Sequence, residues 1–325
     1  MSSSIRKRGA MRYPRTSPVT LGLFSIAMLT GILPVGFAVQ PQSTSRKIVS
    51  DDFTKNRKET ASVESRSKAP AGQSNKTAPP ARPRRTYRLA SSSASRSKPL
   101  SRNMSIAQLG VTIWRLRPIK ANDTGARVLV REKGKSSEWV PERVESDATF
   151  REGDHLRLSI EAPRAGYLYV VDRDLFADGT TGGAMLIYPW SDTDNQVRPG
   201  KLIDIPAQED DPSYFTARLT SANQVGELLT FIVTSSPLDL PIADKPFQIA
   251  TGQMRSWEKI WGGESERFEM EGGAGEAWTP QEQQAAEKKA TRQLTRDDPA
   301  PQTIYRLATK DNSAVLVNVR LRYAK

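Results

Sequence analysis

Two clusters of aspartates come nearest, in residue type and spacing, to a metal site. Calcium is held by six to eight oxygen ligands, and acidic residues at short spacing in a loop supply several of them. The first cluster, formed by Asp172, Asp174 and Asp178, departs from the EF-hand pattern because no acid stands at the twelfth position of the loop. Aspartate is also an ordinary residue of turns, so the sequence favours plain turns over a calcium site. The candidate metal ligands are Asp172, Asp174, Asp178, Asp192 and Asp194.

Nucleophilic catalysis has few available residues in this chain. There is no cysteine, so a cysteine nucleophile, a disulfide framework and a cysteine-zinc site are excluded. A Ser-His-Asp triad would have to use His155, which is the single histidine. No Gly-x-Ser-x-Gly elbow supplies a nucleophile. His155 is therefore predicted to be a partly exposed strand residue that points away from the side of Leu156.

Carboxylates beside an aromatic residue are a second type of candidate. Glu138, Glu142 and Glu145 lie near Trp139, and a pair of carboxylates can hydrolyse glycosides. Nothing in the sequence fixes the separation of these groups, so the pattern is weak. We predict no catalytic and no cofactor-binding residue, and the enzyme question stays open.

The net charge of +12 on 325 residues is unevenly distributed. Residues 1–38 carry +5, residues 39–105 carry +11, and residues 106–325 carry −4. A basic chain suggests nucleic-acid binding only when the folded part is basic. Since the part predicted to fold is mildly acidic, we expect no nucleic-acid partner.

The N-terminus has the pattern of an export signal. Five basic residues precede an uncharged run over residues 19–39, and Gly36 and Ala38 are the small residues of a cleavage site. We predict a signal peptide over residues 1–38 that is cleaved after Ala38. The run is also long enough for an uncleaved anchor, which stays the alternative. Either reading places the rest of the chain in the periplasm or outside the cell.

Residues 39–105 are rich in Ser, Pro, Lys and Arg and hold few large apolar residues. Such a segment buries too little surface to offset its chain entropy, so we predict a disordered basic linker. Its plain role is a spacer. Its charge would also allow electrostatic attachment to anionic envelope polymers or to a membrane.

Beyond residue 105 the sequence changes to short predicted strands separated by turns, among them His155–Glu161, Gly166–Asp172 and Ala184–Tyr188. Leu156, Leu158 and Ile160 alternate with polar residues, as in a strand with one buried face. A helix with an apolar stripe is predicted around Met254–Trp261, and Thr279 with Glu282 forms a capping box. We predict a mainly β, β-sandwich-like (immunoglobulin-like) domain over residues 106–240. Residues 241–325 are predicted as a helical and β extension that packs on it.

Several of these segments resemble the bacterial family called domain of unknown function 4384. The resemblance rests on the Gly-Asp turn before His155, the Gly-Tyr-Leu-Tyr-Val strand from Gly166, the Leu-Ile-Tyr-Pro segment ending at Pro189 and the Gly-Glu-Leu-Leu strand from Gly226. It covers about residues 108–240 in what would be a longer exported form. The family has no agreed activity, so the resemblance implies a fold and the habit of a sensing or binding module.

Together these features predict a non-enzymatic binding or protein-interaction module of the bacterial cell envelope. Its partner would be an envelope protein or a glycan, with membrane contact through residues 19–39 or the basic linker. One alternative is a carboxylate-based envelope hydrolase, with calcium as the candidate cofactor. Another is a structural protein attached to the envelope by its basic linker.

Overall fold

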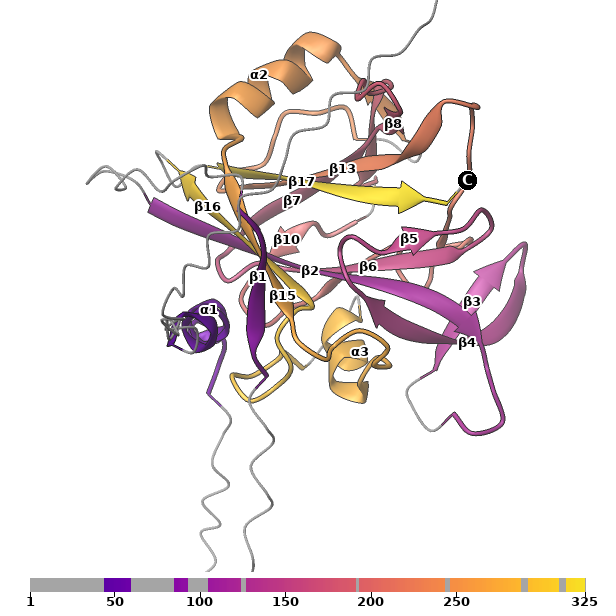
Figure 1. Cartoon of the computed structure of the whole chain (residues 1–325), viewed down its shortest axis with the longest axis vertical. Helices are drawn as coiled ribbons and strands as arrows, with labels where there is room; N and C mark the ends of the chain where they lie inside the picture. The colour runs from indigo at the N-terminus through magenta and orange to yellow at the C-terminus, as the bar shows by residue number, and fades with distance from the viewer. Residues whose placement is uncertain are drawn as a thin grey trace, which may run out of the picture. The chain divides into compact units, whose positions relative to one another are not determined.

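Two β-sheets form most of the fold (Figure 1). A core of aliphatic and aromatic side chains lies between them. The computed structural model describes residues 44–59, 85–92, 105–123, 127–190, 193–242, 246–287, 292–309 and 314–324. All of them belong to the unit that runs from Pro41 to Lys325. The prediction of a mainly β, sandwich-like fold is confirmed. The predicted signal segment and its cleavage site after Ala38 lie outside the described residues.

The first sheet has nine strands among the described residues, and its centre is the long strand β2. One edge of β2 pairs with β16 and then with β4, and the other edge pairs with β6. The members are β1 (Tyr87–Ser92), β2 (Ser105–Pro118), β3 (Val128–Glu132), β4 (Lys135–Val144), β6 (His155–Glu161), β11 (Ile203–Ile205), β12 (Phe215–Thr216), β15 (Ser265–Met270) and β16 (Thr303–Thr309).

The second sheet has eight strands in the described part of the chain, with β13 between β7 and β17. The β7, β13 and β17 strands are antiparallel to one another, whereas β5 pairs with β17 in parallel. The members are β5 (Thr149–Phe150), β7 (Gly166–Asp172), β8 (Asp174–Phe176), β9 (Ala184–Tyr188), β10 (Gln196–Val197), β13 (Gln224–Thr234), β14 (Phe247–Ile249) and β17 (Ala314–Tyr323).

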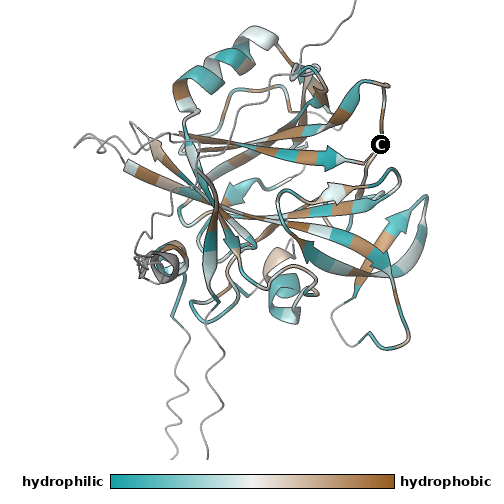
Figure 2. Ribbon diagram, in the orientation of Figure 1, coloured by the Kyte–Doolittle hydropathy of each residue, from teal (hydrophilic) through white to brown (hydrophobic). Residues whose placement is uncertain are grey.

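Alternation along the strands builds the core between the sheets. Leu156, Leu158 and Ile160 of β6 face Phe231 and Val317 of the second sheet within one buried cluster. Strands place successive side chains on opposite faces, which gives the alternating colours along the ribbons in Figure 2.

Three helices cover the outer faces of the two sheets in the described part of the chain. Met254 and Trp257 of α2 (Thr251–Trp261) are buried on the second sheet. Phe53 of α1 (Thr44–Thr54) lies in a cluster with residues of β1, β15 and β16. The third helix, α3 (Pro280–Ala286), covers the first sheet and begins with the predicted capping box of Thr279 and Glu282. Because these helices cover part of each outer face, several polar strand positions are also buried.

The prediction that residues 39–105 form a disordered linker is wrong for two stretches. Residues 44–59 contain α1, and Tyr87–Ser92 forms β1, which pairs with β15. Few apolar residues suffice here because Phe53 and Tyr87 are fully buried in a cluster with side chains of β15 and β16. The rest of this segment lies outside the described residues.

The division at residue 240 is also corrected by the sheet order. Strands β16 and β17 are interior strands of the two sheets, so residues 241–325 are part of the sandwich and not an extension on it. The long strands β2 and β17, near the two ends of residues 105–325, belong to different sheets and do not pair with each other. Sheet order depends on contacts between distant segments, which local patterns do not specify.

Gly110 on β2 leaves the space in which α1 docks, and Gly110→Ala should weaken that docking. An added Cβ would lie 2.2 Å from Pro301 Cγ and 2.7 Å from Phe53 Cζ. Overpacking of this kind costs about 1–3 kcal/mol, so we expect the free energy of unfolding in urea to fall by that amount. Gly252→Ala in α2 is the matched control, because beyond its chain neighbours and its own helical backbone no atom lies within 4 Å of its added Cβ. The control should be neutral or stabilising by up to about 1 kcal/mol, and equal losses in both variants would contradict the prediction.

Candidate functional site

The outer face of β6 carries a row of polar side chains that the fold covers. Arg157, Ser159 and Glu161 are each at most 2% exposed, and His155 is half-buried. Alternation along β6 predicts a polar face turned to solvent, but Arg57, which follows α1, and Trp278, which precedes α3, pack against this face, and Asp204 of the neighbouring strand β11 bonds to it. Buried charges need partners, so the fold must supply ion-pair or hydrogen-bond partners to the side chains of this row.

Asp204 of β11 is the carboxylate that accepts hydrogen bonds from two side chains of this row. Ser159 Oγ donates a hydrogen bond of 2.5 Å to Asp204 Oδ1, and Arg157 Nη2 donates one of 3.3 Å to Oδ2. Behind them, Trp114 Nε1 donates to Ser159 Oγ at 2.8 Å. Asp204 lies opposite Ser159 in the β6–β11 register, so the sheet itself sets this geometry. The carboxylate is therefore held in place before any ligand arrives.

Burial raises the pKa of Asp204 above its ordinary value, while Arg157 and the hydrogen bond from Ser159 act in the opposite direction. Displaced pKa values gather at functional sites, although buried structural networks displace them as well. Asp204 also borders a cavity, and this geometric observation makes it a candidate for the site.

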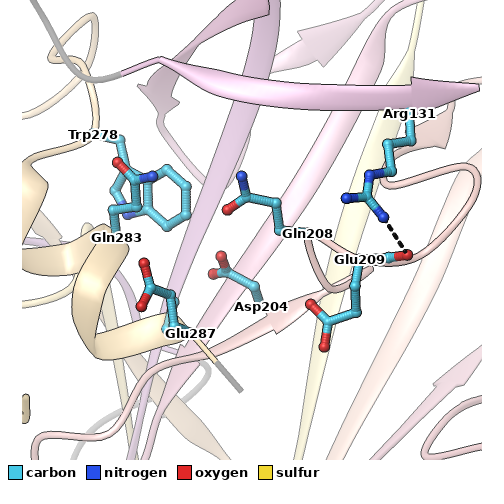
Figure 3. A pocket seen from close by; sticks show the side chains of 8 residues that line it. Arg131, Asp204, Gln208, Glu209, Trp278, Gln283 and Glu287 are labelled. Atoms are coloured by element: carbon cyan, nitrogen blue, oxygen red, sulfur yellow. Dashed lines mark hydrogen bonds between the residues drawn. The ribbon is translucent and has the colours of Figure 1, made fainter. Parts of the chain in front are cut away.

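A pocket of about 280 Å³ opens over Asp204, between β3, the segment after β11, and α3 (Figure 3). Most of its lining is polar, with three carboxylates, two side-chain amides and one guanidinium. The lining residues are Arg131, Asp204, Gln208, Glu209, Trp278, Gln283, Ala286 and Glu287. The volume lies just below the usual range of about 300–1,000 Å³ for small-molecule sites, which suits a ligand of one ring.

The side chains in the pocket come from two sides. Figure 3 shows Asp204 and Gln208 facing Gln283 and Glu287 across the opening. On the far side, Arg131 Nη1 donates a long hydrogen bond of 3.4 Å to the backbone oxygen of Glu209. The carboxylates and amides thus converge on one space.

A smaller cavity of about 60 Å³ adjoins this pocket and shares four lining residues with it, Asp204, Glu209, Ala286 and Glu287. It adds two aromatic residues, Tyr188 and Trp190, whose ring centroids are 6.0 Å apart. At roughly 30 Å³ per water molecule, it has room for a substituent and not for a second ring.

Trp278 forms the back wall of the larger pocket. It is 3% exposed, and its ring lies 5.8 Å from that of Trp114 and under the guanidinium of Arg157 at 5.5 Å. Its Nε1 is buried with no hydrogen-bond partner among the described residues. The indole therefore makes the wall rigid, and the polar side chains provide most of the accessible surface.

Asp172 and Asp174, predicted as loop ligands for calcium, lie on strands β7 and β8 instead. They share a face with Glu227 of β13, which is opposite Asp174 in the register. Burial first, then the neighbouring Glu227 and Asp174, raises the pKa of Asp172 to about 8. One of its carboxylate oxygens, Oδ1, has no hydrogen-bond partner among the described residues.

The other predicted ligands do not join them. Asp178 accepts hydrogen bonds from the backbone and side chain of Thr180 in a turn, and Asp194 pairs with Lys201 at 2.9 Å. Asp192 lies outside the described residues. In the described part of the chain, no group of three or more His, Asp or Glu side chains is arranged to hold a metal ion.

The remaining candidates are also separated from one another. Glu138, Glu142 and Glu145 each pair with a different arginine, so they do not form a carboxylate pair. His155 packs between Trp139 and Tyr214, with ring centroids 5.0 and 4.1 Å away. Burial lowers its pKa. An imidazole enclosed by two aromatic rings is a packing residue of the sheet.

Sequence reasoning missed the pocket residues. Asp204 carried a usable indication, because it lies between Ile203 and Ile205, whose side chains face the core. Alternation then turns Asp204 to the other face. Glu209, Gln283 and Glu287 carried none, since they meet Asp204 only through the fold.

Comparisons with known proteins leave the family open. Searches against protein-family models, curated proteins and solved structures found no match to the chain. The resemblance to the domain of unknown function 4384 therefore stays a prediction. Among the described residues, no helix is both long and apolar enough to cross a membrane.

Proposed function

We propose that this chain is an exported, non-enzymatic binding module of the bacterial cell envelope that takes its ligand in the pocket over Asp204. The observation that carries the proposal is the carboxylate of Asp204, fixed from behind by Ser159 and Arg157 and bordering a polar cavity. A group positioned in this way suits recognition, since the Asp204 side chain itself has little conformational freedom left to lose when a ligand binds. The uncharged run over residues 19–39 supports export.

Wild-type chain should co-sediment with isolated envelope fractions, and Glu287→Lys should abolish this. Glu287 is exposed at the mouth of the pocket, so reversing its charge changes the site and not the core. Glu264→Lys makes the same change of charge at an exposed position that lines neither cavity, and it should sediment like the wild type. Equal sedimentation of all three proteins would overturn the pocket as the binding site.

The same preparation tests the hydrolase alternative. Three carboxylates line one pocket, and paired carboxylates are the machinery of glycoside hydrolysis. However, Ser159 and Arg157 occupy both oxygens of Asp204, which favours a fixed binding group over one that moves protons. Soluble fragments or new reducing ends released from the envelope fraction would replace the binding proposal with the hydrolase.

Attachment by the basic linker is the third possible function, and its test must leave α1 and β1 intact. Removing residues 40–105 would delete α1 and β1, so loss of attachment would have two causes. Changing Arg66, Lys68, Lys76, Arg82 and Arg84 to glutamine removes charge without shortening the chain. Retention of this variant at low salt supports the pocket, and its release supports attachment by the linker.

A further inference from the structure

We propose that the pocket over Asp204 recognises an amino sugar, with its ammonium group beside the carboxylates and its hydroxyl groups on the two glutamine amides. This inference rests on the proposed binding function and names its ligand class. It is argued from the charge, the hydrogen-bonding groups and the size of the cavity.

The charge of the lining calls for a cation. The two adjoining cavities are lined by the carboxylates of Asp194, Asp204, Glu209, Asp210 and Glu287, against the cations Arg131 and Lys201. Lys201 is already paired with Asp194, and Arg157, behind the pocket, is paired with Asp204. The carboxylates of Glu209, Asp210 and Glu287 then face the single guanidinium of Arg131. Acidic groups in a partly enclosed site attract a cationic ligand and repel an anionic one.

The side-chain amides in the pocket favour a cationic ligand that also carries hydroxyl groups. Gln208 and Gln283 face each other across the opening near Asp204 and Glu287 (Figure 3). A side-chain amide both donates and accepts hydrogen bonds, and each hydroxyl group of a sugar does the same. A simple alkyl amine would bring methylene groups against these amides and leave their hydrogen bonds unmade, which costs free energy.

The dimensions select one ring. A volume of about 280 Å³ fits a single sugar ring, and the adjoining cavity of about 60 Å³, beside Tyr188 and Trp190, fits one substituent of that ring. Trp278 and its neighbour Arg157 close the rear of the site, so the ligand enters from the mouth beside Glu287.

Ligand-observed NMR titration of the full chain tests this with glucosamine, glucose and putrescine as probes. Glucosamine should bind at least tenfold more tightly than glucose, which has the same ring without the amine. Its affinity should fall as salt is raised from 20 to about 500 mM, since screening weakens the contact between charges. Glucose binding as tightly as glucosamine, putrescine binding as tightly or more tightly, or no probe binding would each overturn the inference.

Matched variants locate the contact. Glu287→Gln should weaken glucosamine binding about tenfold and leave glucose unaffected, because the variant keeps the shape and removes one charge. Gln284→Ala changes the exposed neighbour of Gln283 outside the pocket lining and should bind like the wild type. If envelope co-sedimentation still depends on Glu287 but glucosamine fails to bind, the ligand class is wrong and the binding function stands.

Discussion

Replacing Arg57 with alanine is expected to lower the free energy of unfolding by about 3–5 kcal/mol. Arg57 Nε and Nη2 donate to the two oxygens of Glu161 at 2.7 and 2.5 Å, and both side chains are 1% exposed. The remaining guanidinium donors reach backbone oxygens of residues 295, 298 and 299. Without Arg57, the carboxylate of Glu161 stays buried without its counter-charge. Chemical unfolding in urea measures the loss.

Lys55→Ala is the control for this variant. Lys55 pairs with Asp52 at 2.6 Å on the same segment, but the side chains are 59% and 36% exposed. An exposed pair of this kind contributes about 0–1 kcal/mol, so the control should unfold close to the wild type. If Arg57→Ala prevents folding altogether, Arg57→Lys retains the charge without the two-pronged contact and should show a smaller loss. A wild-type stability for Arg57→Ala would mean that residues 44–59 are not docked in solution.

The free energy of unfolding should fall as the pH rises from about 5 to 8, and Asp172→Asn should remove much of that fall. The pKa of Asp172 is about 8 in the folded chain, against an ordinary value of 3.8. Between these values the folded state holds a proton that the unfolded state has released, so raising the pH favours unfolding. One such group gives a slope of up to about 1.4 kcal/mol per pH unit. Asp172→Asn should therefore be the more stable protein above pH 7.

Urea unfolding at pH 5, 6, 7 and 8 measures the two slopes. Burial also raises the pKa of Glu227 on the same face, so some slope should remain in the variant. Asp178→Asn is the matched control, because hydrogen bonds from Thr180 lower the pKa of this exposed carboxyl. Any stability that Asp178 contributes is lost only as the pH falls through its lowered pKa, so the slope above pH 5 should match the wild type. Parallel slopes for wild type and Asp172→Asn would contradict the buried protonated carboxyl.

Local patterns predicted several elements well. The strands expected at His155–Glu161, Gly166–Asp172 and Ala184–Tyr188 are β6, β7 and β9 with the same bounds. Alternation and apolar runs bounded by turns determine such strands because their side chains select a face within a few residues. The capping box of Thr279 and Glu282 was equally readable, since both partners lie in one helical turn.

Residues 44–59 and 85–92 show the opposite case. Their composition is that of a disordered linker, and on average that judgement follows from low apolar content. Two residues, Phe53 and Arg57, reverse it for α1, because the sandwich offers Phe53 a space beside Gly110 and offers Arg57 the buried carboxylate of Glu161. Composition counts residues, but docking depends on a surface that exists only after the sheets have formed.

The candidate site shows the same difference between what local sequence patterns predict and what the tertiary structure adds. By itself, the sequence determined the β class of this protein, most of its central strands and the absence of cysteine chemistry. Only the tertiary structure decided that the polar face of β6 is covered and that Asp204, Gln208, Gln283 and Glu287 share one pocket. The physical reason is the distance along the chain over which each effect acts. Hydrophobic periodicity acts over a few residues, whereas a pocket is formed by side chains some 80 positions apart that the sheet order and the docking of α3 bring together.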